Sequence, residues 1–163
     1  MRKKSTIAII ILLAVLAVAV TVLAVLNSKS ALAKQQLLKD ARFLIAADGE
    51  EYTVAMEDLE ALEPREIVAN YKKSGRDPEI RRYTGVPFAA VLRARGVQPE
   101  GMRTAVFSAA DGYVSALPIA DALDEENCFI VIDNGNEGPF RMILAKDRFS
   151  QRWCKLLIEV TLK

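Results

Sequence analysis

The stretch Tyr83-Thr84-Gly85-Val86-Pro87-Phe88 decides the fold of this 163-residue chain. The residues that lead into it, Ile80–Tyr83, have an extended pattern. Pro87 suits the first turn of a helix, because its fixed φ is already helical and its missing N–H costs nothing there. The apolar face of that helix recurs at i, i+3 and i+4, at Phe88, Val91 and Leu92. The stretch therefore predicts a strand that passes into a short helix, which Gly96 ends.

Outward from this stretch, short apolar runs alternate with turn signals such as Asp48-Gly49 and Asp111-Gly112. We predict further strands at Phe43–Ala46, Tyr52–Val54, Ile67–Tyr71, Thr104–Ser108, Tyr113–Leu117, Phe129–Ile132, Phe140–Leu144 and Leu156–Leu162. Short helices are predicted at Met56–Leu62 and Ile119–Leu123. Paired strands joined by tight turns, with few helices, are typical of the α+β class.

The N-terminus carries a long apolar run, Ile7 to Leu26, which Thr21 alone interrupts. About 20 helical residues cover the roughly 30 Å hydrocarbon core of a bilayer. The basic residues Arg2, Lys3 and Lys4 precede the run, and this favours a cytoplasmic N-terminus. We therefore predict a single transmembrane helix at 7–26 after a cytoplasmic segment at 1–6.

A cleaved signal peptide is the alternative, because Ala31-Leu32-Ala33 forms an A-x-A site. The apolar run is longer than the roughly 7–15 residues typical of such a peptide, so the anchor is the preferred interpretation. In either case a polar stalk at 27–40 leads to a domain at 41–163 outside the cytoplasm. The predicted location is thus the cell membrane, with one span and an extracytoplasmic domain.

Charge and composition exclude several kinds of function. Six of the 22 basic residues precede Asp40, so 16 basic and 21 acidic residues remain, a net charge of −5. A mildly acidic domain lacks the basic surface that nucleic-acid binding needs. The chain has no histidine, which excludes Ser-His-Asp catalysis and any His-ligated metal site. No metal ligands and no catalytic residues are assigned.

The two cysteines, Cys128 and Cys154, each lie within an apolar run. Two buried free thiols are the preferred interpretation. One disulfide is the alternative in an oxidising compartment.

Four motifs follow one another along the domain in a recognisable order. They are Tyr83–Phe88 with Val91-Leu92 and Gly96-Val97, Ser108–Tyr113 with Leu117–Ala122, Gly138–Ile143, and Trp153–Lys155 with Ile158–Val160. In sequence and spacing they resemble the sulfite-oxidase-like molybdopterin-binding domain family across roughly Tyr52 to Val160. The resemblance implies a sulfite-oxidase-type fold of short mixed strands with a few helices. It also implies molybdopterin as a possible cofactor.

The resemblance also implies where a molybdenum ligand would lie. In enzymes of this family a cysteine thiolate binds the metal, and its position falls around Asn70–Ser74 here. That segment reads Asn70-Tyr71-Lys72-Lys73-Ser74 and contains no cysteine. Tyr, Lys and Ser do not replace a soft anionic sulfur ligand. Cofactor binding is therefore doubtful on the sequence.

Five residues are candidates for binding a cofactor or a small anion: Tyr71, Lys73, Arg81, Arg141 and Arg152. Arginine forks suit phosphate, and lysines near the former metal position could donate to an anion. A structural role is the preferred interpretation for three of them: a strand end for Tyr71 and Lys73, and an exposed basic face for Arg81. For Arg141, which could lie on either face of a strand, neither role is preferred. Arg152 lies in a polar loop before Trp153, which is expected to belong to the core.

The sequence supports three hypotheses about function. The preferred one is a membrane-anchored, non-catalytic or altered module that binds a small anionic ligand or a membrane protein partner. The first alternative is a molybdopterin-binding redox protein that exchanges electrons with a membrane partner. The second is a structural subunit of a membrane complex. Whether the chain is an enzyme is left open.

Overall fold

The computed structural model describes residues 2–72, 77–132 and 138–163. Two compact units make up the chain, Met1–Gln36 and Leu37–Lys163. A single helix, α1, runs Arg2–Lys39 and thus includes most of the expected stalk. Within the residues that the structure describes, no helix offers a stretch both long and apolar enough to cross a bilayer.

The second unit holds two sheets. The five-stranded sheet A has the order β2 (Glu50–Ala55), β1 (Arg42–Ala47), β9 (Leu157–Leu162), β5 (Thr104–Ala109) and β6 (Val114–Pro118). Its first and last strands along the chain, β1 and β9, lie side by side and parallel, while the other neighbours are antiparallel. Both residues of the predicted Asp48-Gly49 turn have positive φ, 52° and 81°, as a two-residue hairpin of type I′ requires.

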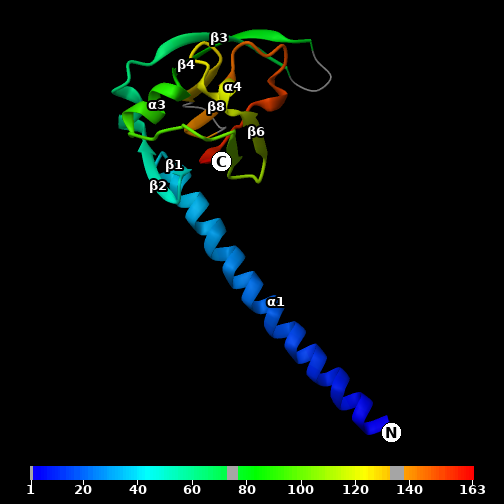
Figure 1. Cartoon of the computed structure of the whole chain (residues 1–163). Helices are drawn as coiled ribbons and strands as arrows, with labels where there is room; N and C mark the ends of the chain where they lie inside the picture. Colours follow the sequence, from blue (N-terminus) through cyan, green and yellow to red (C-terminus); the bar gives the residue numbers. More distant parts are fainter. Residues whose placement is uncertain (1, 73–76, 133–137) are drawn as a thin grey trace. The chain divides into compact units, whose positions relative to one another are not determined.

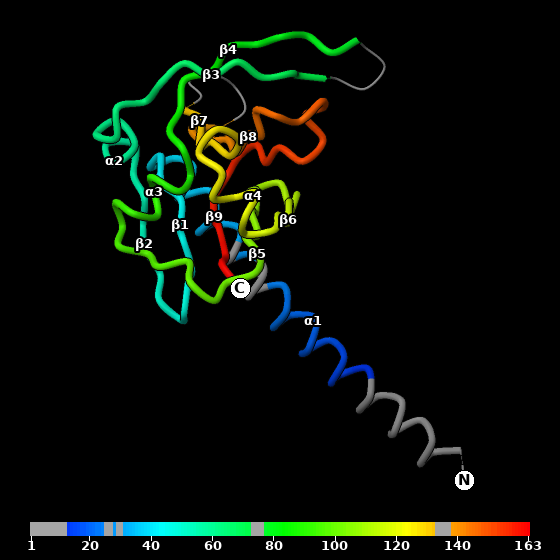
Figure 2. Tube along the Cα trace, turned by 45° about the horizontal axis from the view of Figure 1, so that its top comes forward, coloured from blue at the N-terminus to red at the C-terminus, as the bar shows by residue number. Residues whose placement is uncertain are grey.

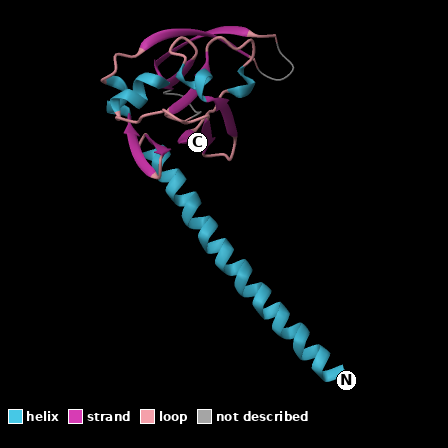
Figure 3. Cartoon of the chain, viewed as in Figure 1, coloured by secondary structure: helices cyan, strands magenta, loops and turns pink. Residues whose placement is uncertain are grey.

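The four-stranded sheet B is antiparallel throughout. Its order is β3 (Arg65–Tyr71), β4 (Glu79–Pro87), β7 (Cys128–Ile132) and β8 (Phe140–Leu144). Figure 1 shows β3 and β4 along one side of the unit and the β1–β2 hairpin at the opposite side. The short helices α2 (Met56–Glu60), α3 (Phe88–Ala94) and α4 (Ile119–Leu123) and the 3₁₀ turn η1 (Ser150–Arg152) lie between strands (Figure 3).

Aromatic side chains join the two sheets through the core. Phe43 of β1 meets Phe140 of β8 edge to face at a centroid distance of 5.2 Å, and both side chains are fully buried. Phe88 contacts Phe107 of β5 edge to face at 5.1 Å, and this pair joins α3 to sheet A. The predicted apolar face of α3 is buried, which confirms the helix that follows the opening stretch.

The passage from β4 into α3 differs from the expectation in one respect. The sequence predicts Pro87 inside the first helical turn, but it is the last residue of β4 and the residue before the helix, with φ −58° and ψ 134°. Its fixed φ fits either position, and only ψ separates them. Gly85, two residues earlier, pairs with Val131 of β7, and a Cβ there would lie 2.5 Å from the carbonyl oxygen of Ile130. The two backbones can approach this closely only because the residue is glycine.

Candidate functional site

Cationic and aromatic side chains gather around Trp153 at the end of sheet B. We call this group the Trp153 cluster. Its members come from β3, β4, β8 and the segment after η1, and they are Tyr71, Arg81, Tyr83, Arg141, Trp153 and Lys155.

Three aromatic rings form the centre of the cluster. The Trp153 ring lies edge-on to Tyr83, with centroids 5.6 Å apart and planes at 83°. The Tyr71 ring packs against the Trp153 ring, with centroids 6.1 Å apart and ring planes at 44°. Both separations are in the range of favourable aromatic pairs. Trp153 and Tyr71 are 3 % and 4 % exposed, so the rings are fixed by packing.

Three cations lie over the tyrosine rings. The Arg81 guanidinium carbon is 3.9 Å from the Tyr71 centroid, and the Lys155 Nζ is 5.4 Å from the same ring. The buried Arg141 lies 5.7 Å from the Tyr83 centroid. Arg81 also pairs with Glu79. Stacking on an aromatic face fixes the plane of a guanidinium group without using its N–H donors.

Two hydrogen-bond donors are buried among these rings. Within the described residues, neither the Tyr83 O–H nor the Trp153 Nε1–H donates to an acceptor. Burial raises the pKa of Tyr83 above its usual value, and the nearby Arg141 and Arg81 only partly offset this. The hydroxyl therefore keeps its proton at neutral pH. A buried donor without a partner costs about 1–3 kcal/mol, so an acceptor supplied by a ligand would be stabilising here.

Hydrogen bonds hold the segment that carries Trp153 on two sides. Ser150 Oγ accepts from the Lys72 backbone N–H at 3.1 Å and donates to the Lys72 carbonyl at 3.0 Å, which joins η1 to the end of β3. From the other side, Tyr113 Oη donates to the Gln151 carbonyl at 2.6 Å and Ser115 Oγ to the Arg152 carbonyl at 2.7 Å. These bonds position Trp153 over sheet B.

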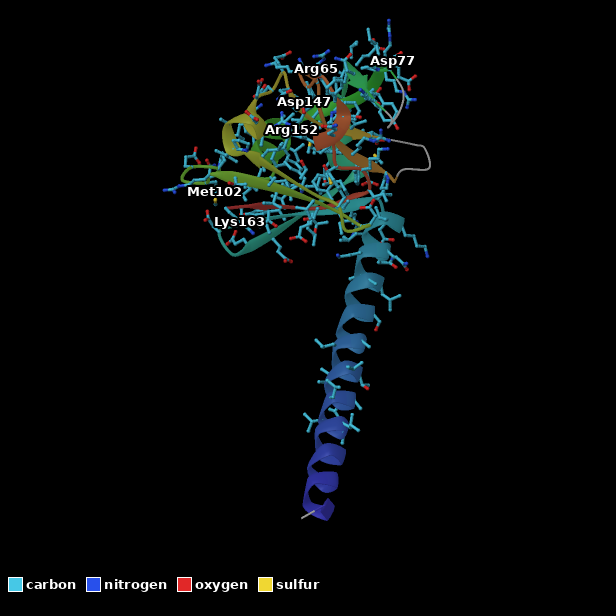
Figure 4. The ribbon with its side chains drawn as sticks, turned by 90° about the vertical axis from the view of Figure 1, so that its right-hand side faces the viewer. Arg65, Asp77, Met102, Asp147, Arg152 and Lys163 are labelled. Atoms are coloured by element: carbon cyan, nitrogen blue, oxygen red, sulfur yellow. The ribbon has the colours of Figure 1, made fainter. Side chains whose placement is uncertain are left out.

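The structure brings together three of the five predicted binding residues, Tyr71, Arg81 and Arg141. Arg152 lies elsewhere: its guanidinium donates to Asp147 at 2.9 Å and 2.5 Å and faces Asp121 at 3.3 Å (Figure 4). Its hydrogen bond to Asp147 raises the pKa of Arg152. Its contact with Asp121 joins the end of η1 to α4. Lys73 lies outside the described residues.

Three members of the cluster were not among the predicted binding residues: Tyr83, Trp153 and Lys155. The sequence did contain a pattern that points to these three residues, because side chains two positions apart lie on the same face of an extended chain. Tyr83 is two residues from Arg81, and Lys155 is two residues from Trp153. Tyr83 could therefore have been predicted from Arg81, and Trp153 and Lys155 from the polar loop that precedes them.

The two cysteines are buried free thiols, as preferred on the sequence, and not a disulfide. Cys128 is opposite Leu144 on one side of β8, and Cys154 is bridged to Met142 on the other side. Burial raises the pKa of Cys154 to about 12 and that of Cys128 far above its usual value. Both side chains are therefore neutral thiols at physiological pH.

These thiols do not fit the metal ligand that the family resemblance implies. A molybdenum site of that kind needs an accessible thiolate near Asn70–Ser74, and no cysteine occurs there. Tyr71 turns inward at this point and is covered by Arg81 and Lys155. Among the described residues, no three His, Cys, Asp or Glu side chains gather as a metal site. The residues present therefore do not fit a thiolate-bound molybdenum centre.

Comparison with known proteins relates the chain to others through its fold. No family model and no curated protein sequence matches it. Among solved structures it is similar to the sulfane dehydrogenase SoxCD from Paracoccus pantotrophus, with a TM-score of 0.60 and 16% sequence identity. The match covers 77% of this chain and 38% of that one, so the chain spans well under half the length of this structural relative. The likeness shows a shared two-sheet α+β fold, and it supports the fold that the sulfite-oxidase resemblance implied.

Proposed function

We propose that this chain is a non-catalytic binding module that holds a small anionic ligand, an oxyanion or a phosphate-bearing molecule, at the Trp153 cluster. One observation carries the proposal. Cations from three different segments converge on stacked aromatic rings that also bury two hydrogen-bond donors, Tyr83 Oη and Trp153 Nε1, without acceptors in the described part of the chain. Fixed donors and positive charge are what an oxyanion requires.

The absence of a suitable thiolate supports a binding role over redox chemistry at molybdenum. A fold related to molybdopterin enzymes does not by itself carry their activity. The metal's soft ligand has no counterpart here, whereas the cationic surroundings that suit an anion are present. A ligand-binding scaffold without the metal accounts for both features.

The test uses the full chain purified in detergent and titrated with sulfate or inorganic phosphate, with chloride as the ionic-strength control. Trp153 is the only tryptophan, so its fluorescence reports directly on the cluster. We expect sulfate or phosphate to change this fluorescence saturably and to raise the unfolding temperature, because a ligand that binds only the folded state stabilises it. No saturable change with either anion would contradict the proposal.

Two neighbouring arginines provide a matched pair of variants. Arg81 lies over Tyr71, whereas Arg82 points to the other face of β4 and pairs with Glu66 at 2.9 Å. Arg81→Gln should weaken anion binding tenfold or more, since a charge-assisted hydrogen bond is worth about 1.5–3 kcal/mol. Arg82→Gln removes the same charge and should leave binding within about twofold. Equal losses would point to non-specific attraction.

Molybdenum and pterin content of the protein from its own host separates this proposal from the redox alternative. We expect both at background. Stoichiometric molybdenum would overturn the non-catalytic assignment and support the alternative, a molybdopterin-binding redox protein.

We also propose that residues 7–26 anchor the chain in the cell membrane, with the domain outside the cytoplasm. The apolar run and the basic residues Arg2, Lys3 and Lys4 before it support this. The full-length chain should stay in the membrane fraction after carbonate extraction, and protease added outside intact cells should digest the domain. A mature chain that begins after Ala33 would instead establish a cleaved signal peptide.

A further inference from the structure

The two sheets end in four edge strands, and three of these are protected against pairing with another chain. In sheet A, β2 begins with Glu50-Glu51, and β6 ends in Pro118, which has no N–H to offer. In sheet B, the outer side of β8 is occupied by Cys154, which exchanges two backbone hydrogen bonds with Met142 at 2.8 Å and 3.0 Å. The remaining edge is β3.

The β3 edge differs from β2 in the sign of its charges, because β3 begins with Arg65 and Glu66, which carry opposite charges. Its centre, Ile67–Asn70, contains no charge and no proline, and β3 pairs with β4 over seven consecutive residues without a register shift. Both ends of β3 are engaged: Ser150 binds the Lys72 backbone, and the Arg65 side chain donates to the Glu125 carbonyl and pairs with Glu126. An open hollow of about 270 Å³ adjoins its first residues, Arg65–Val68, and Glu126, Phe129 and Ala145 line its other side. Figure 2 shows the β3–β4 hairpin at the margin of the unit.

The outer face of this hairpin carries two exposed apolar side chains beside the ion pair of Arg82 with Glu66. Val68 is 54 % exposed and Ile80 of β4 is 74 % exposed. Because Val68 is opposite Arg82 and Asn70 is opposite Ile80, the two apolar side chains are diagonal neighbours on one face. A regular edge with an uncharged centre, beside exposed apolar side chains, is a template for β-strand addition.

We propose that β3 pairs antiparallel with β3 of a second copy of this chain, about a twofold axis at Val68, and joins the two copies of sheet B. In this register Val68 faces itself, Ile67 faces Ala69 of the second copy, and Glu66 faces Asn70. No like charges meet in this register, so electrostatic repulsion does not oppose the pairing. Moving the axis to Glu66 would place two carboxylates opposite each other, which is destabilising.

Cysteine cross-linking tests this register. Facing residues of an antiparallel pair have Cα atoms about 4.5 or 5.5 Å apart, and both separations are within the range for a disulfide. Val68→Cys in the full chain, in its own membrane, should therefore form a cross-linked dimer under mild oxidation. The matched control is Val114→Cys, because Val114 is also a valine in an edge strand and is also 54 % exposed.

We expect Val68→Cys to cross-link at least tenfold faster than Val114→Cys. The wild-type chain should not cross-link, since Cys128 and Cys154 are both fully buried. Equal rates for the two variants, or no dimer from Val68→Cys, would overturn the proposal.

A second measurement distinguishes β3 pairing from association through the N-terminal helix. Val68→Lys places two positive charges opposite each other at the axis, and its exposed position lets the domain keep its fold, which circular dichroism can verify. The mass of the full chain in detergent, from light scattering, should fall from dimer to monomer. Val114→Lys should remain a dimer. A folded Val68→Lys protein that is still dimeric, or a monomeric wild type, would contradict pairing through β3.

Discussion

Replacement of Gly85 by alanine is expected to lower the free energy of unfolding by about 3 kcal/mol or more. The added Cβ would lie 2.5 Å from the Ile130 carbonyl oxygen and 2.9 Å from the Val131 Cα. Both are backbone atoms of β7, so no side chain can rotate away, and β4 must separate from β7 at the centre of sheet B. Urea unfolding of the full chain, followed by Trp153 fluorescence, measures the loss.

Gly101→Ala is the matched control for this prediction. Gly101 has φ +85°, and no atom lies within 4 Å of the place that a Cβ would take there, so alanine adds backbone strain and no collision. We expect a cost of about 1–2 kcal/mol, the usual penalty for an L-residue in the left-handed region. If the two variants lose the same stability, close contact between β4 and β7 is not the reason for glycine at 85.

Gly85 shows which structural features a local sequence pattern can predict and which it cannot. The stretch Tyr83–Phe88 correctly predicted a strand followed by a helix, because strand and helix formation depend on nearby residues. The reason for the glycine depends on β7, more than 40 residues later in the chain. A contact of this kind leaves no local signal.

Strand pairing shows the same limit on a larger scale. The predicted strands lie within the observed ones to within a few residues, since alternation and turn residues are local properties. The parallel pairing of β1 with β9 was not predicted, although it joins the beginning and end of the domain. Register between distant strands is set by tertiary packing, which one sequence does not reveal.

The candidate site could be predicted only in part for the same reason. Tyr71 and Arg81 were singled out separately, and they meet because β3 and β4 form a hairpin in which Ala69 is opposite Arg81. Arg152 was singled out by charge alone. Its partners, Asp147 and Asp121, include a residue of α4 about 30 positions away, so the sequence could not show that its charge is already balanced.

Replacement of Trp153 by alanine should cost about 3–5 kcal/mol of stability, the usual range for loss of a large buried aromatic side chain. Trp153 is 3 % exposed and packs against Tyr71 and Tyr83, so its removal leaves both tyrosine rings without their common neighbour. Because the variant loses its fluorescence probe, unfolding is followed by circular dichroism. A loss below about 1 kcal/mol would contradict a central packing role.

Trp153→Phe separates packing from ligand binding at the same position. Phenylalanine keeps an aromatic ring between Tyr71 and Tyr83 but removes Nε1, a buried donor that has no partner in the described structure. Its stability cost should stay below about 2 kcal/mol, since part of the lost packing is offset by removal of an unsatisfied donor. Anion binding, measured by the shift in unfolding temperature, should nevertheless weaken several-fold. If Trp153→Phe binds sulfate or phosphate as tightly as the wild type, Nε1 does not face the ligand, and the anion must be held by the cations alone.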